Sequence, residues 1–217
     1  MHIMIHACPA REWYVTGFLV PSLIRQGIPP DDIEVYMDRD RKGNLASCID
    51  SFKRASERAG ETWHLQDDVV VCRDFADRAS KVPEGIVCGF SVARYETTQA
   101  VGETIAGYMW QSSFPCIKIP NHIAGEFSEW LTKEAMRRDD LHEYIATGKK
   151  DDTLFHIFMR EKHFSEPVTN LIPHLADHID WLIGGSVINR TREFVARASH
   201  WEDEETITEL KAKLAGR

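Results

Sequence analysis

Short hydrophobic or alternating stretches recur along the first half of the chain, separated by segments with a helical repeat. The short stretches are rich in β-branched residues and bounded by Gly, Pro or charged residues, which is typical of β-strands. The predicted strands cover residues 2–7, 33–37, 62–65, 86–90 and 116–119. Helical spacing is found at residues 13–26 and from Asn44 to Gly60. A β-α-β-α-β opening of this kind predicts a mostly parallel central sheet flanked by helices.

Single residues set the expected limits of these two helices. Pro21 has no backbone N–H, so it should kink or divide the first helical segment before Gly27 ends it. Asn44 is a good N-cap for the second helix, which Gly60 should close. The charged segment 38–43 is expected to form the loop between that helix and the preceding strand.

The second half of the chain is expected to be more helical. Apolar residues at helical spacing predict one helix from residue 123 to about 138 and another that begins at Asp151 or Asp152. A third should run from Glu202 to the end of the chain, with acidic residues first and basic residues last, as the helix dipole favours. Because no repeat, low-complexity run or convincing linker interrupts the 217 residues, we expect a single domain, 1–217.

Composition and charge narrow the class of protein. With 43% hydrophobic and 28% charged residues, the chain has the composition of an ordinary soluble globular protein. No apolar run approaches about 18 residues, so no membrane insertion is expected, and the first residues do not read as a signal peptide. The net charge of −8 gives no general attraction to nucleic acid or anionic membranes. Five widely spaced cysteines favour free thiols, a reducing compartment and a cytoplasmic location.

The segment 63–71 combines an apolar strand, two adjacent carboxylates and a run of valines. Ionised carboxylates are unfavourable in a strand environment unless they are partnered, and a divalent cation is a suitable partner for oxygen ligands. In mostly parallel sheets, ligands bind beyond the carboxyl ends of the strands, where Asp38, Asp67 and Asp68 are expected to lie. The pair therefore predicts a metal and phosphate site. The alternative is a turn after the strand, a position that Asp also favours.

Several of these motifs together resemble a GT-A-type glycosyltransferase. The matching elements are a first strand followed by Pro9-x-Arg11, the helix start Gly43-Asn44, the strand end Gln66-Asp67-Asp68, and the segment 173–180. Most of residues 1–190 is also similar to small glycosyltransferase-like proteins of bacteriophages and prophages, at residues 63–71, 114–120 and 181–189. The resemblance implies a GT-A-like, Rossmann-like fold. Residues from 1 to about 120 would bind a nucleotide sugar, and residues from about 121 to 217 would form the acceptor side and the C-terminal helices.

The resemblance also implies a divalent metal, Mn²⁺ or Mg²⁺, that bridges the diphosphate of the donor. Asp68 is the expected direct ligand, while Asp67 would contact ribose or sugar hydroxyls or reach the metal through water. The first acidic position of the DxD-type motif is Gln66 here, which loses a charge but keeps an amide for the nucleotide. His178 is the expected C-terminal metal ligand, with His174 as its rival and a structural role as the alternative for both.

Other residues have expected roles around the donor. Arg11 and Asp38 are candidate nucleotide contacts, Arg11 through charge-assisted hydrogen bonds and Asp38 as an acceptor from uracil or ribose. The alternative for both is an ordinary surface position. Gly184 and Gly185, followed by Ser186, would let the backbone approach the diphosphate closely, and a tight turn is the alternative.

Asp151 and Asp152 form the second acidic pair. An inverting transfer needs a carboxylate that accepts the proton of the acceptor hydroxyl, and Asp152, or else Asp151, is the candidate base. The alternative is an ordinary loop and helix N-cap, because Asp favours that position.

The expected function is therefore a metal-dependent glycosyltransferase with a UDP-sugar as the expected donor, in the bacterial cytoplasm if the protein is phage-encoded. A modified DNA base, a glycan or a protein stays open as the acceptor, and so does the oligomeric state. Two alternative functions also stay open. One is a metal-dependent phosphodiesterase or nuclease, and the other is a nucleotide-sugar-binding protein that has lost catalysis.

Overall fold

The computed structural model describes residues 1–90, 105–107, 114–147, 151–171 and 174–179, together with the single positions 183, 208 and 212. Two sequence predictions lie outside these residues: the diphosphate contacts Gly184, Gly185 and Ser186, and nearly all of the expected helix from residue 202 onward. None of the described helices is long and apolar enough to cross a membrane.

A seven-stranded mixed sheet forms the centre of the described part of the molecule, in the order β2-β1-β3-β7-β5-β8-β6. β1, β2, β3, β5 and β8 run in one direction, and β6 and β7 run in the other. The strands are β1 (His2–Ala7), β2 (Ile33–Met37), β3 (Glu61–Gln66), β5 (Ile86–Cys88), β6 (Ile105–Gly107), β7 (Cys116–Pro120) and β8 (Val168–Asn170). The prediction of an α/β fold with a mostly parallel sheet is confirmed.

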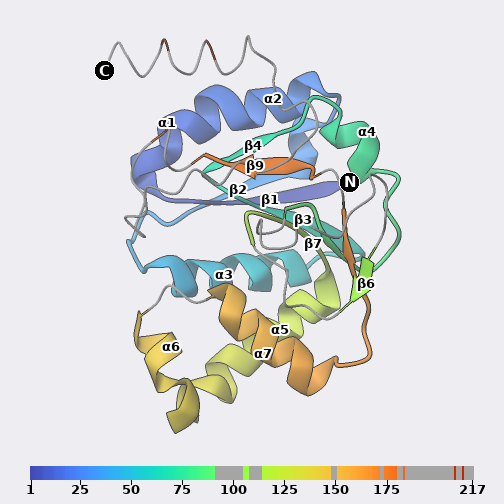
Figure 1. Ribbon diagram of the computed structural model, residues 1–217. Helices are drawn as coiled ribbons and strands as arrows, with labels where there is room; N and C mark the ends of the chain where they lie inside the picture. The colour runs from blue at the N-terminus through green and yellow to red at the C-terminus, as the bar shows by residue number, and fades with distance from the viewer. Residues whose placement is uncertain are drawn as a thin grey trace.

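Helices cover both faces of this sheet (Figure 1). One face carries α1 (Glu12–Tyr14) and α2 (Val20–Arg25), and the other carries α3 (Asn44–Ser56), α5 (Asn121–Lys133) and α7 (Asp151–Lys162). Two shorter helices are α4 (Phe75–Ala79) and α6 (His142–Thr147). Each face has its own hydrophobic cluster: Ile3 and Ile5 of β1 belong to the α1–α2 side, and Phe52 of α3 packs with Phe127 and Phe155 on the other.

The helix type changes just before Pro21, within the segment that this proline was predicted to kink or divide. The run from α1 to α2 is continuous, but Val15–Leu19 between them is π-helical, and Pro21 lies in the first turn of α2. Proline cannot donate to the carbonyl one turn earlier, and its ring crowds that carbonyl. A wider turn just before the proline accommodates both effects, so the helix continues without breaking.

A second, two-stranded sheet was not predicted. It pairs β4 (Val69–Val71) with β9 (Ala176–His178) in antiparallel orientation, with Val69 opposite His178. In Figure 1 this small sheet lies between the helices α1 and α2 and the central sheet. Because β4 follows Asp68 directly, the pairing brings the C-terminal segment to the acidic pair.

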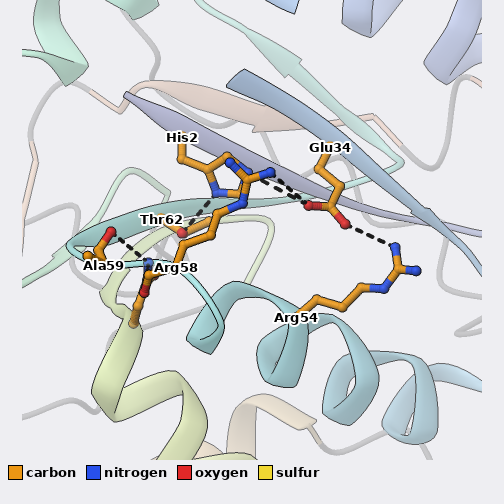
Figure 2. A network of polar contacts seen from close by, with 7 residues as sticks. His2, Glu34, Arg54, Arg58, Ala59 and Thr62 are labelled. Carbon is orange, nitrogen blue, oxygen red and sulfur yellow. Dashed lines mark hydrogen bonds and ion pairs between the residues drawn. The ribbon is translucent and has the colours of Figure 1, made fainter. Parts of the chain in front are cut away.

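A network of polar side chains joins the strands at their amino ends (Figure 2). His2 Nδ1 lies 3.0 Å from the hydroxyl of Thr62, which connects β1 to β3. Glu34 of β2 accepts from Arg54 in the last turn of α3 at 2.9 Å and pairs with Arg58, just after that helix, at 3.5 Å. These contacts hold the first three strands together at the end of the sheet opposite their carboxyl edge.

Candidate functional site

The connections of the first three strands bring two loops together at the carboxyl edge of the sheet. The helices after β1 cover one face, whereas α3 after β2 covers the other, and β3 returns to lie beside β1. The loop after β1 and the turn after β3 therefore meet where the winding direction changes. In open α/β sheets this position is where ligands bind.

Arg11 joins both members of the acidic pair at this edge of the sheet. It lies at the end of the short 3₁₀ turn Pro9–Arg11 after β1, while Asp67 and Asp68 form the turn between β3 and β4. Its Nη1 donates to Asp67 Oδ1 at 2.7 Å and to Asp68 Oδ2 at 2.6 Å. Each of the three residues is only 7% exposed. The alternative of an ordinary surface position for Arg11 is wrong, because its side chain is buried with the two carboxylates that it pairs with.

The remaining partners of the two carboxylates come from β1 and β9. The backbone N–H of Cys8 donates to Asp67 Oδ2 at 2.7 Å, and His178 Nε2 lies 3.0 Å from Asp68 Oδ2. Asp68 Oδ1 is buried and has no hydrogen-bond partner among the described residues. Three of the four carboxylate oxygens are thus engaged, and one buried oxygen remains for a ligand.

The two aspartates differ in pKa although they are neighbours. Burial alone would raise the pKa of Asp68, but the hydrogen bond and charge of His178 and the charge of Arg11 outweigh it and lower that pKa. The pKa of Asp67 is raised, because burial and the negative charge of Asp68 outweigh Arg11 and the Cys8 N–H. Asp68 is therefore the stronger candidate for a permanently ionised ligand.

The donor chemistry fits a hard divalent cation, although the ligands are not assembled around one. Carboxylate oxygens and an imidazole nitrogen suit Mn²⁺ or Mg²⁺, and the unpartnered Asp68 Oδ1 is an oxygen of the required kind. Within the described ranges, however, no three His, Cys, Asp or Glu side chains are arranged to hold a metal ion. Arg11 occupies the place between the two carboxylates instead.

His178 and His174, the two candidate histidines, have different surroundings. His178 contacts Asp68, whereas His174 lies against Phe90, with ring centroids 5.6 Å apart. Burial and the nearby charge of Arg78 lower the pKa of His174 to about 4. The geometry therefore brings His178, the residue named from the resemblance, to the acidic pair.

Asp38 holds the loop that leads into α3. It is buried, and its two oxygens accept from the backbone N–H groups of Lys42 at 2.9 Å and Gly43 at 3.0 Å. Burial acts to raise the pKa of Asp38, but these hydrogen bonds outweigh it and lower that pKa. Asp38 is thus not the surface residue that the alternative suggested. Gln66 ends β3 beside His6 of β1, at the same carboxyl edge.

Asp151 and Asp152 begin α7 next to the first turn of α3. Asp151 is buried and interacts with the side chain of Asn44, and burial together with the charge of Asp152 raises its pKa to about 6. Asp152 is half-buried and accepts from the backbone N–H of Thr153 at 2.7 Å. Both carboxylates therefore lie near the N-terminal end of α3, and Asp152 is the more accessible of the two.

The sequence did not single out Asp177, although its environment is unusual. It lies opposite Val70 in the β4–β9 pair, is 3% exposed, and neither of its oxygens has a partner among the described residues. Burial raises its pKa to about 7. The only local signal was a carboxylate within the apolar segment 175–179.

Comparisons with known proteins find likeness in structure only. No protein-family model matches the sequence, and no curated protein sequence matches it. A197 from STIV is similar in structure, with 18% identity, 82% of this chain and 86% of that chain covered, and a TM-score of 0.47. HddC from Yersinia pseudotuberculosis is similar with 10% identity, 58% and 80% covered, and a TM-score of 0.30. At these low values we base the proposed function on the geometry of the site.

Proposed function

We propose that this protein is a glycosyltransferase that binds a nucleoside-diphosphate sugar, with UDP as the expected nucleotide, between the carboxyl ends of β1 and β3. The observation that carries this proposal is the buried pair Asp67–Asp68 at the carboxyl edge of the sheet, with one carboxylate oxygen that has no partner in the part of the chain that the structure describes. The resemblance of the motifs to GT-A-type enzymes supports the same assignment.

A bound Mn²⁺ or Mg²⁺ would neutralise the charge that develops on the departing diphosphate. Asp68 and His178 would hold the ion, since they already contact each other at the turn after β3. Asp67 would complete the acidic pair. Asp38 and Gln66 lie at the carboxyl edge, where they would help to shape the nucleoside side. Gly184, Gly185 and Ser186 remain the proposed diphosphate contacts.

The proton of the acceptor hydroxyl needs a base near the bound sugar. Asp152 is our candidate because it is half-buried and can be reached by a substrate, whereas Asp151 is buried against α3. The negative charge of Asp152 in turn helps to keep the pKa of Asp151 high. The acceptor itself remains a choice among a DNA base, a glycan and a protein.

The hydrolytic alternative has less support in the structure. A metal-dependent phosphodiesterase or nuclease surrounds one or two metals with several carboxylates and histidines, and the described residues contain no such group. A single metal on a sugar nucleotide needs fewer protein ligands, because the phosphates supply part of its coordination. The site therefore favours the transferase.

Thermal unfolding with added ligands tests the donor site. We expect UDP together with Mn²⁺ to raise the melting temperature more than either alone, because the metal links the diphosphate to the carboxylates. At about 100 times the dissociation constant, the stabilisation is about 2.7 kcal/mol. If no nucleoside diphosphate with metal shifts the melting temperature, the proposed donor site is wrong.

Two isosteric variants separate binding from chemistry. Asp68→Asn should abolish metal-dependent nucleotide binding, because it removes the charged ligand. Asp152→Asn should leave binding nearly unchanged and lower turnover of a UDP-sugar, as expected for a group that acts in the transition state. Equal losses of binding in the two variants would contradict the role of Asp152 as base. An absence of turnover with intact binding would instead favour the binding protein without catalysis.

A further inference from the structure

Arg11 takes a position that is normally suited to a bridging cation. A single nitrogen, Nη1, lies 2.7 Å from an oxygen of Asp67 and 2.6 Å from an oxygen of Asp68. The guanidinium side chain is buried together with both carboxylates. Charge-assisted hydrogen bonds of this kind are among the strongest that side chains form.

The charges in this cluster do not favour an anionic ligand. Two ionised aspartates and one arginine leave a net charge of −1 before His178 is counted, so an approaching diphosphate meets no net attraction. Exchange of the arginine for a divalent cation between the carboxylates would change that sum to 0, and to +1 when the released guanidinium beside them is counted. The released guanidinium would then be a second positive group for the phosphate oxygens, which it binds well.

The unpartnered Asp68 Oδ1 indicates that the cluster is not built for ion pairing alone. A buried carboxylate oxygen without a donor among the described residues is unfavourable, and in native proteins such a group calls for an explanation, of which a bound ion is one. Arg11 uses the other oxygen of the same carboxylate, which His178 also shares. The oxygen available to a ligand thus belongs to the carboxylate that Arg11 already neutralises.

We propose that Arg11 is the resident cation of the acidic pair in the unloaded protein and that it competes with a divalent metal for Asp67 and Asp68. Metal binding frees the guanidinium from the carboxylates, and Arg11 then pairs with the diphosphate of the donor. The competition stands on the observed ion pairs, whereas the diphosphate contact rests on the proposed function.

The Mn²⁺ affinity of the protein without nucleotide tests the competition. We expect Arg11→Gln to bind Mn²⁺ at least tenfold more tightly than the wild type, because the variant removes the competing charge and keeps a polar side chain. Arg39→Gln is the control, since Arg39 is exposed and pairs with Glu12, the residue next to Arg11. Its affinity should equal that of the wild type. Electron paramagnetic resonance of free Mn²⁺ gives both constants.

An unchanged or weaker Mn²⁺ affinity in folded Arg11→Gln overturns the proposal. Circular dichroism establishes whether the variant is folded. If the variant is not folded, the wild type provides the test. Mg²⁺ should shift the NMR signal of the Arg11 Nε–Hε group and leave the corresponding signal of Arg39 in place. The Arg11 signal is assigned by its absence from the spectrum of Arg11→Lys. An Arg11 signal that does not respond at saturating Mg²⁺ also overturns the proposal.

UDP separates the failure of this inference from the failure of the proposed function. At saturating Mn²⁺, Arg11→Gln should bind UDP at least tenfold more weakly than the wild type, because the released guanidinium is missing. Equal UDP affinity contradicts the diphosphate contact. If the wild type binds Mn²⁺ but no nucleoside diphosphate, the proposed function fails, while the Mn²⁺ comparison still decides the competition.

Discussion

His174 and His178 differ in which side chain each contacts, and this difference can be tested. His178→Ala should weaken Mn²⁺ binding, because its imidazole lies 3.0 Å from Asp68. As a ligand it must lose its proton, so the metal affinity of the wild type should fall as the pH is lowered. His178→Ala should lose part of that pH dependence. His174→Ala, measured by the same titration, should change neither property, and a matching loss in His174→Ala would contradict the assignment.

Asp151 gives a second prediction at the level of single residues. Its pKa is raised from 3.8 to about 6 in the folded protein by burial and by Asp152. The folded state therefore holds the proton more tightly than the unfolded chain. The titration of Asp151 therefore does not lower the free energy of unfolding below about pH 4. That free energy falls as the pH rises from about 4 to about 6, where the unfolded chain has already lost the proton.

Asp151→Asn cannot titrate, so its free energy of unfolding should exceed that of the wild type by an amount that grows from about pH 4 to about pH 6. A shift of about two pKa units corresponds to about 3 kcal/mol. Urea unfolding at several pH values measures the difference. Asp31→Asn, at an exposed carboxylate, is the control. A constant difference across this pH range would show that the burial of Asp151 is not the cause.

The position of the acidic pair was predictable from the sequence, and the resemblance named His178 beside it, but the ion pair with Arg11 was not predicted. Asp67 and Asp68 follow a strand whose pattern is local, so their place at the strand end can be read directly. The ion pair with Arg11 depends on how the loop after β1 lies over the turn after β3. Such contacts arise from tertiary packing and leave no periodic signal in the sequence.

At the level of elements, Gly43 connects the loop of Asp38 to the start of α3. It has φ +92° and ψ 167°, a conformation that is essentially restricted to glycine. Gly43→Ala should lower the free energy of unfolding by about 1–3 kcal/mol. It should also weaken binding of UDP with Mn²⁺, because its N–H holds Asp38.

Gly60→Ala is the matched control for this variant. Gly60 also has a positive φ, +89°, and lies where the chain leaves α3 toward β3, at the amino end of the sheet. Its substitution should destabilise the protein without an effect on nucleotide affinity beyond that of unfolding. Equal losses of affinity in the two variants would show that the Asp38 loop does not shape the site.

Long strands were easier to predict from the sequence than short ones, although the three-residue strand β5 lies within the predicted strand 86–90. The predicted strands at residues 2–7 and 33–37 match β1 and β2, because five or six residues are enough to show an alternating pattern. Helix α3 begins at Asn44, one position after the N-cap Gly43. The strands β4, β8 and β9 have three residues each, and pairing with distant segments defines them. Local pattern carries too little information for such strands.

At the scale of the whole molecule, all five cysteines are free thiols. Four are buried, and burial raises the pKa of the Cys72 and Cys88 thiols to about 12. We expect the melting temperature to be the same with and without a reducing agent, because no disulfide contributes to stability. Differential scanning calorimetry checks this, with thiol titration of the unfolded protein as a control. A lower melting temperature under reduction would contradict it.

The architecture of the whole molecule followed from the order of its elements. Alternating strands and helices predicted the parallel part of the sheet, and that arrangement predicted which edge would hold polar groups. The sequence did not predict the strand order beyond β3, the strand β6 or the antiparallel direction of β7. Strand order depends on which long-range pairings bury the most apolar surface, and many orders satisfy the same pattern of elements.

The β4–β9 pair also has a consequence for the newly synthesised chain. Asp68 leaves the ribosome long before His178, and the strand that carries His178 can pair with β4 only after most of the described chain has emerged. Until then the acidic pair has no imidazole beside it. Nascent chains that stop before β9 should therefore fail to gain Mn²⁺ affinity, even when the sheet strands β1, β2 and β3 have already assembled. In this protein, metal binding would report that synthesis has passed β9.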